Sequence, residues 1–195
     1  MHEPGHEWRE PSGDVARSGK SERVPVWDWP LRAWHWALVV FVLIAWFTPS
    51  KYDGVHRFAG YVVIGLLVFR LGWGFLGTRY SRFRALRARL RAAPAYLWSL
   101  RYGNSGRYIG LNPAGAAMMV ALLALLAIST ITGAMQVTVR FFGVWWVEDT
   151  HAYSSDAVMI LVVLHVIGTI LMSVVQRENL VWAMFTGRKL RRPGE

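Results

Sequence analysis

Long runs of apolar residues alternate with short polar or arginine-rich stretches along most of the chain. Each run is close to the ~20 residues that a helix needs to cross about 30 Å of hydrocarbon. Proline marks several boundaries, because Pro30 and Pro113 stand just before apolar runs and Pro49 follows one. The pattern predicts an all-α fold, an integral membrane four-helix bundle with spans at about residues 31–48, 55–76, 114–135 and 151–175.

Two segments lack the character of a span. Residues 1–24 are polar, contain Pro and Gly and show no period, which predicts a disordered tail in which His2 and His6 are solvated. Residues 79–101 mix regularly spaced arginines with leucine and aromatic residues, which predicts an amphipathic helix on the membrane surface. For this helix, a role as a basic anchor is favoured over a docking site. The four-helix domain is therefore expected to occupy residues 25–190.

The charge distribution supports the membrane interpretation and predicts the orientation of the chain in the membrane. The chain is 54% hydrophobic yet carries a formal net charge of +10. A nucleic-acid-binding domain would not alternate basic segments with spanning ones, so no nucleic-acid partner is expected. Eighteen Lys and Arg residues lie in the N-terminal segment, the link between the second and third spans and the C-terminal tail, against three (Lys51, Arg57 and Arg140) on the other side. The positive-inside rule then places both termini in the cytoplasm.

The lack of cysteine narrows the redox chemistry open to the chain. Without thiolates there are no iron–sulfur ligands, no covalent c-type haem attachment and no disulfide. Any redox centre must therefore use histidine, methionine, tyrosine or carboxylate ligands. Ionisable residues in or beside spans are costly and tend to be functional. Four histidines have such positions: His35, His56, His151 and His165.

The spacing of these histidines resolves them into two pairs. His151 and His165 are 14 residues apart on one helix, which returns them to within about 40° of the same face and separates them by about 21 Å. His56 opens the second span at the level of His151. His35 lies 14 residues before Pro49, at the level of His165. Facing imidazoles at two depths are what two low-spin b haems require, with one ligand on each side of each iron.

Arg70 is the other candidate residue. It follows His56 by 14 residues and so lies near the depth of the His35–His165 pair. Two interpretations stay open: a guanidinium that binds a haem propionate, or one that snorkels to the cytoplasmic interface. A proton-coupled carrier is disfavoured, since the spans contain almost no carboxylates, and a zinc site is disfavoured because the histidines lie at two separate depths.

Four stretches of the chain resemble the bacterial cytochrome b561 and nickel–iron hydrogenase b-type cytochrome family. They are WDWPLRAWHW at the first span, HRFAGYVVIGLLVFRLGWGFLGTRY across the second, NPAGAAMMVALLALLAISTITG at the third, and VLHVIGTILMSVVQRENLVWAMFTGRK at the end. The resemblance covers about residues 24–190. It implies two b haems in a bundle of the bacterial inner membrane, ligated by the pairs His35–His165 and His56–His151.

The resemblance also implies several functions. The leading expectation is electron transfer between a periplasmic partner, a c-type cytochrome or a dehydrogenase subunit, and the membrane quinone pool. The alternatives are a stand-alone superoxide:ubiquinone oxidoreductase and a haem-bearing anchor subunit of a hydrogenase or dehydrogenase. Membrane lipid and quinone are the other expected ligands, and a homodimer is an open option. Charged residues near the periplasmic surface are mixed in sign, which weakens steering of anionic superoxide: Lys51, Arg57, Arg140, Glu148, Asp149 and Asp156.

Overall fold

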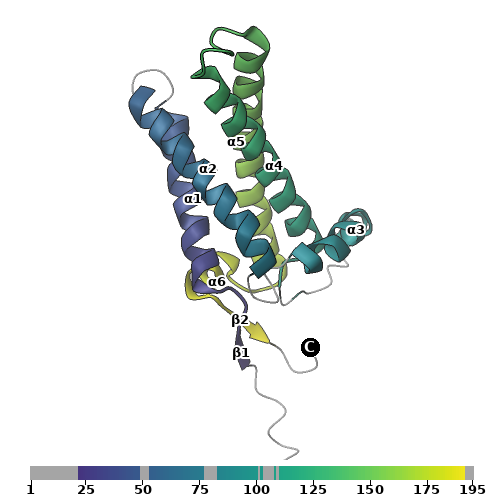
Figure 1. The fold of residues 1–195 in the computed structure, drawn as a ribbon. Helices are drawn as coiled ribbons and strands as arrows, with labels where there is room; N and C mark the ends of the chain where they lie inside the picture. The colour runs from purple at the N-terminus through teal and green to yellow at the C-terminus, as the bar shows by residue number, and fades with distance from the viewer. Residues whose placement is uncertain are drawn as a thin grey trace, which may run out of the picture.

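The computed structural model describes residues 22–48, 53–76, 83–100, 102, 108 and 110–191. Figure 1 shows two pairs of long helices, α1 beside α2 and α4 beside α5. The described part of the chain is mostly helical, and these four helices are long and apolar enough to cross a membrane. The prediction of an all-α membrane bundle is therefore confirmed. The helices are α1 Trp29–Phe47, α2 Asp53–Leu76, α4 Pro113–Gln136 and α5 Trp145–Val175.

Helices α1 and α4 begin after residues whose side chains accept from a free N–H group of the first turn. The Asp28 carboxylate accepts from the Leu31 N–H at 3.0 Å, and the Asn112 side chain accepts from the Gly115 N–H at 2.7 Å. A proline occupies the first turn of α1 and of α4, as predicted from the sequence. Helix α5 begins at Trp145, six residues before the predicted span, and carries Glu148 in its first turn, where a carboxylate is favoured by the helix dipole.

Shorter elements surround one end of the bundle. Helix α3, Phe83–Leu100, falls within the predicted amphipathic segment, of which residues 79–82 and 101 lie outside the described residues. Helix α6, Leu180–Thr186, follows α5. Strand β1, Glu22–Pro25, pairs antiparallel with β2, Arg188–Arg191. Residues 22–24 of the predicted disordered tail are thus ordered by the backbone of β2, while residues 1–21 lie outside the described part of the chain.

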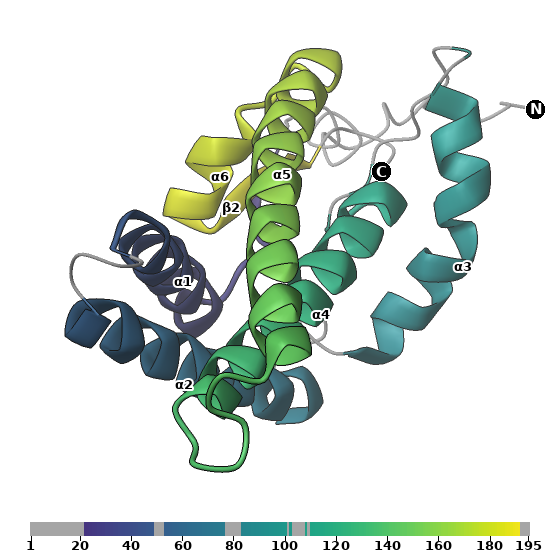
Figure 2. The ribbon, with the colours of Figure 1, turned by 90° about the horizontal axis from the view of Figure 1, so that it is seen from above.

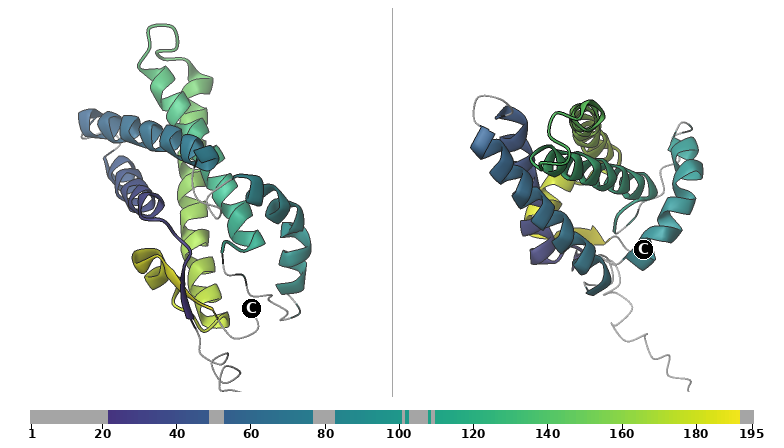
Figure 3. Two further views of the ribbon diagram at one scale, coloured as in Figure 1. Left: turned by 60° about the horizontal axis from the view of Figure 1, so that its bottom comes forward. Right: turned by 45° about the horizontal axis from the view of Figure 1, so that its top comes forward.

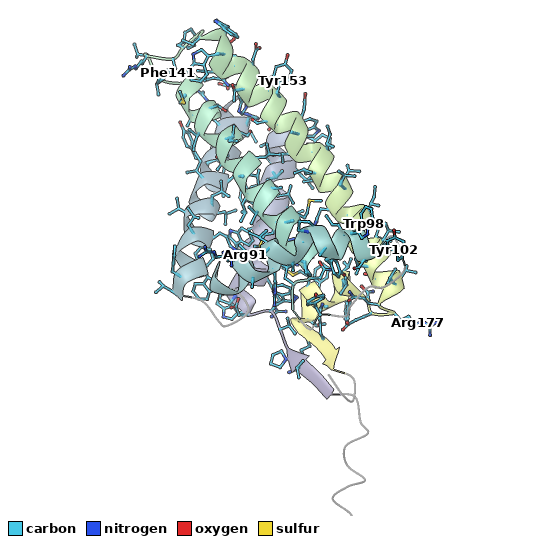
Figure 4. The ribbon with its side chains drawn as sticks, turned by 90° about the vertical axis from the view of Figure 1, so that its right-hand side faces the viewer. Arg91, Trp98, Tyr102, Phe141, Tyr153 and Arg177 are labelled. Carbon is cyan, nitrogen blue, oxygen red and sulfur yellow. The ribbon has the colours of Figure 1, made fainter. Side chains whose placement is uncertain are left out.

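The strand pair brings both described ends of the chain to one end of the bundle, here called the inner end. The other end, the outer end, carries the α4–α5 connection. Seen from above in Figure 2, α6 lies on the same side of α5 as α1, and α3 lies on the far side of α4 from α5. Figure 3 shows the same two helix pairs from two further directions. Helix α3 runs nearly across the direction of the spans at the inner end, with Arg91 near its middle and Trp98 toward its C-terminal end (Figure 4).

Most apolar side chains of the spans face outward. Only 6% of the most apolar window of α5 is buried inside the structure. An exposed apolar surface of that length is unfavourable in water and favourable in lipid, so the bundle presents it to hydrocarbon. A small core layer of Val63, Leu126 and Val158 joins α2, α4 and α5, and residues of α1 pack against it.

A cap of backbone and aromatic contacts ties the start of α1 to the end of α6. The N–H groups of Val26 and Trp27 donate to the Gly187 carbonyl at 2.9 and 3.1 Å. The Arg32 guanidinium donates to the carbonyl of Phe185. The Phe185 ring stacks on Trp36 with centroids 4.3 Å apart. The inner end is therefore closed by α6 rather than left open.

Gly187→Ala is expected to loosen this cap by about 1–3 kcal/mol. Gly187 has a φ of +75°, and a Cβ there would lie 2.7 Å from the Trp27 carbonyl oxygen. Faster hydrogen exchange at the Val26 and Trp27 amides, whose N–H groups donate to the Gly187 carbonyl, would report the loss. Gly143→Ala is the matched control, because Gly143 has a φ of +70° with open space around it. Equal loss of protection at the cap in both variants would contradict the role of the close contact.

Candidate functional site

His56 and His151 face each other at the outer end. His56 lies in the first turn of α2 and His151 in the second turn of α5. Their ring centroids are 6.0 Å apart and their planes meet at 88°. The spacing argument expects this pair at one depth, and the bundle brings the two rings together across α2 and α5. These two histidines are called the outer pair.

The ring of His56 is held by the end of α1. Its Nδ1 lies 2.8 Å from the carbonyl oxygen of Ala45. A carbonyl only accepts, so Nδ1 carries the proton and Nε2 keeps its lone pair. The Ala45 carbonyl also accepts a longer bond from the Thr48 N–H, at 3.4 Å. It lies in the last turn of α1, four residues before Pro49, which has no N–H to donate. The proline that ends the first apolar run therefore marks the turn that supplies this acceptor.

The ring of His151 is held in the same way by α4. Its Nδ1 lies 2.8 Å from the carbonyl oxygen of Ser129, which again leaves Nε2 free as a ligand. The Ser129 hydroxyl bonds that of Ser155 at 2.8 Å, and Ser155 donates to the His151 carbonyl at 2.7 Å. Helices α4 and α5 are therefore joined by side chains at the level where the His151 ring is oriented. The sequence did not single out Ser129, because a backbone acceptor has no side-chain signature.

Gly133 makes room for the His151 ring. A Cβ at Gly133 would lie 2.9 Å from Cε1 and 3.1 Å from Nδ1 of His151. Such distances are too short for ordinary packing, so any side chain at this position would displace the imidazole. The lack of a side chain at Gly133 therefore allows the His151 ring to pack against the backbone of α4. Gly60 and Gly168, by contrast, have open space where a Cβ would lie.

His35 and His165 lie on α1 and α5 toward the inner end and are called the inner pair. They are close enough for their imidazoles to interact electrostatically, but no ring contact joins them among the described residues. The Nδ1 of His35 is buried and has no hydrogen-bond partner in the described part of the chain. Its ring meets Trp36 edge to face at 5.3 Å. The inner pair, like the outer pair, joins α5 to a helix of the other helix pair, but it lacks the close ring contact of the outer pair.

Arg70 is buried inside the bundle, with 3% of its surface exposed. Its Cζ lies 5.8 Å from the ring centroid of Trp34, and its Nη2 lies 3.7 Å from Sδ of Met119. The carboxylate of Asp28 is close enough to interact with it electrostatically. Trp34 is itself buried and donates to the Leu66 carbonyl at 2.7 Å. The guanidinium thus points among α1 and α4 rather than to the interface, in contrast to the snorkelling interpretation.

The donor set fits a haem iron. A metal bonded to an imidazole nitrogen at about 2 Å on each side places the two ring centroids roughly 6 Å apart, the separation of the outer pair. Both outer rings have Nδ1 engaged, so both present the basic Nε2 that a metal takes. In the described residues no group of three or more His, Cys, Asp or Glu could hold a metal. A macrocycle that supplies four nitrogens of its own needs only the two axial ligands present here.

The core layer separates the two pairs. Val158 lies seven residues after His151 and seven before His165, which is about 10 Å along α5 in each direction. Val63 lies seven residues after His56 on α2. Val158 and Val63 are both buried, with 3% and 2% exposed, so the layer that they form with Leu126 is apolar. An electron could cross this apolar layer, whereas a proton would find no polar group in it.

Comparisons with known proteins identify the family of the chain. The family description that matches residues 26–187 is prokaryotic cytochrome b561. A relative from Rhodobacter capsulatus is described as a probable Ni/Fe-hydrogenase B-type cytochrome subunit. It is 24% identical to this chain over an alignment of 231 positions, gaps included, which covers 91% of this chain and 87% of the relative. No match was found among solved structures. The chain belongs to the prokaryotic cytochrome b561 family and is a membrane haem b protein of electron transfer.

Proposed function

We propose that the chain holds two b haems, one between His56 and His151 and one between His35 and His165. In this proposal it passes electrons across the inner membrane between a periplasmic redox partner and the quinone pool. The observation that carries the proposal is the outer pair, with ring centroids 6.0 Å apart and both Nδ1 atoms bonded to carbonyls. The arginine count favours a cytoplasmic inner end.

The residues of the chain have separate tasks in this proposal. Haem iron supplies reversible one-electron chemistry when bound. The four imidazoles bind the metal, and the carbonyls of Ala45 and Ser129 hold the outer rings in the required tautomer. Arg70 offers its guanidinium to an anionic propionate at the level of the inner pair. The core layer of Val63, Leu126 and Val158 keeps water out between the two pairs.

The charges at the outer end favour a protein partner over superoxide. Arg57 forms an ion pair with Asp53 at 2.8 Å, which reduces its field at the surface. Among the described residues near the outer pair, two cations then stand against four carboxylates, and Lys51 lies outside them. A net negative surface repels an anionic substrate. The group is Arg57 and Arg140 against Asp53, Glu148, Asp149 and Asp156.

The proposal is tested by the haem content of the purified full-length chain. We expect two haems per chain and a reduced-minus-oxidised spectrum of low-spin b type, because each iron has two imidazole ligands. Pyridine haemochrome analysis against protein concentration measures the ratio. A chain that carries one haem would contradict the second site, and a colourless chain would contradict both.

A further inference from the structure

Helix α3 has two sides of different chemistry. On one side Ala93 and Tyr96 are buried, with 5% and 6% of their surfaces exposed, and the helix packs on α4. Arg87, Arg91 and Trp98 are exposed. Because four and seven residues separate these three in turn, they lie within about 40° of one another and at least about 140° from Tyr96. Together they are called the α3 stripe, which lies on the side of the helix opposite to the buried one.

The two arginines of the α3 stripe belong to a segment without carboxylates. No Asp or Glu occurs between Asp53 and Glu148, and residues 79–107 contain eight arginines. Like charges four residues apart on a helix repel each other. An anionic group placed between Arg87 and Arg91 would remove that repulsion, and a guanidinium binds phosphate with two parallel hydrogen bonds. The α3 stripe therefore favours a ligand that carries a negatively charged phosphate.

The apolar side chains around the arginines favour a lipid over a soluble anion. Leu97, Trp98 and Tyr102 are 51%, 60% and 72% exposed, and the Trp98 and Tyr102 rings lie 6.1 Å apart. Tryptophan and tyrosine prefer the interface between membrane and water. Since α3 runs nearly across the spans, a bilayer crossed by the spans has α3 along its surface (Figure 4). Free phosphate or an acidic peptide would leave the apolar groups in water, whereas the headgroup region of a bilayer covers both kinds of side chain.

We infer that the α3 stripe binds the headgroups of anionic phospholipids in the leaflet at the inner end. The lipid phosphate lies against Arg87 and Arg91, and the ring of Trp98 lies among the glycerol and ester groups. This adds selectivity for lipid charge to the basic anchor that the sequence predicts. The site does not involve the histidine pairs, so it stands or falls independently of the haems.

Native mass spectrometry of the full-length chain in detergent tests the site, with phosphatidylglycerol or phosphatidylcholine added as the probe. We expect the wild type to bind phosphatidylglycerol more tightly than phosphatidylcholine. Arg87→Gln combined with Arg91→Gln should lower the affinity for phosphatidylglycerol by about 25-fold, at about fivefold for each arginine. The matched control, Arg57→Gln combined with Arg140→Gln, removes the same charge at the outer end and should retain the wild-type affinity. Circular dichroism checks that each variant keeps its helices.

A third variant separates the arginines from the aromatic residue. Trp98→Ala should weaken the binding of both lipids to a similar extent, because an indole ring does not distinguish their charges. Equal binding of the two lipids by the wild type, or an equal loss in the two double variants, would overturn the inference. Unchanged phosphatidylglycerol affinity in the α3 double variant would also overturn it and would point to an acidic protein segment as the ligand.

Discussion

His151→Ala is expected to leave one haem per chain where the wild type holds two. The substitution removes one axial ligand of the outer site, and His56 alone cannot form the six-coordinate low-spin centre. Removal of an imidazole also leaves the Ser129 carbonyl without the donor that lies 2.8 Å away in the wild type. The expected result is half the haem absorbance per chain, with a remaining low-spin spectrum from the His35–His165 site.

Two further variants make this result specific. His56→Ala removes the opposite ligand of the same site and should give the same single-haem spectrum. His6→Ala changes a histidine in the N-terminal segment outside the described residues and should keep both haems. If His151→Ala and His56→Ala left spectra that differed from each other in the remaining haem, the pairing of these two histidines would be wrong.

Gly133→Ala is expected to weaken the outer haem site without removal of a ligand. The new Cβ would lie 2.9 Å from Cε1 of His151, so the ring must move away from α4. That movement stretches the Nδ1 hydrogen bond to the Ser129 carbonyl and shifts Nε2 from its position opposite His56. Loss of such a supporting contact lowers metal-site affinity on the order of 10- to 100-fold. Haem retention on dilution in detergent measures the change.

The EPR spectrum separates a displaced ligand from general destabilisation. Imidazole planes at 88° would leave the two π-type orbitals of a bound ferric iron, which share three electrons, nearly equal in energy, and this gives a strongly anisotropic low-spin signal. Gly133→Ala should reduce that anisotropy in the outer haem that remains. Gly65→Ala is the matched control, since Gly65 is exposed on α2 with no atom near the added Cβ. An unchanged EPR signal and an unchanged haem affinity in Gly133→Ala would contradict a role for this glycine in the outer site.

The local sequence was enough to predict the membrane spans and the depths of the histidines along them. A run of about 20 apolar residues identifies a membrane helix whatever its neighbours are. The 14-residue separation of His151 and His165 then sets their faces and depths through helix geometry alone. The predicted spans accordingly lie within a few residues of α1, α2 and α4. Helix α5 begins six residues before the predicted span, at Trp145, because a helix can extend beyond the segment that crosses the hydrocarbon.

The orientation of each ligand was decided by contacts between helices. Whether Nδ1 or Nε2 of His151 faces a metal depends on a carbonyl of α4, 22 residues earlier in the chain. The position of Arg70 also depends on contacts between helices: it is buried beside Trp34 of α1, and the sequence had left two interpretations of this arginine open. Strand β1 was not predicted, since its backbone partners in β2 lie at the far end of the chain.

By itself the sequence determined that this is a four-helix membrane protein with facing histidines at two depths, because hydrophobic runs and helical periodicity are local properties. Only the tertiary structure decided how the outer pair is held: the acceptors are the backbone carbonyls of Ala45 and Ser129, and Gly133 admits the ring. Every residue has a carbonyl, so the choice among them follows from the packing of α1 on α2 and of α4 on α5.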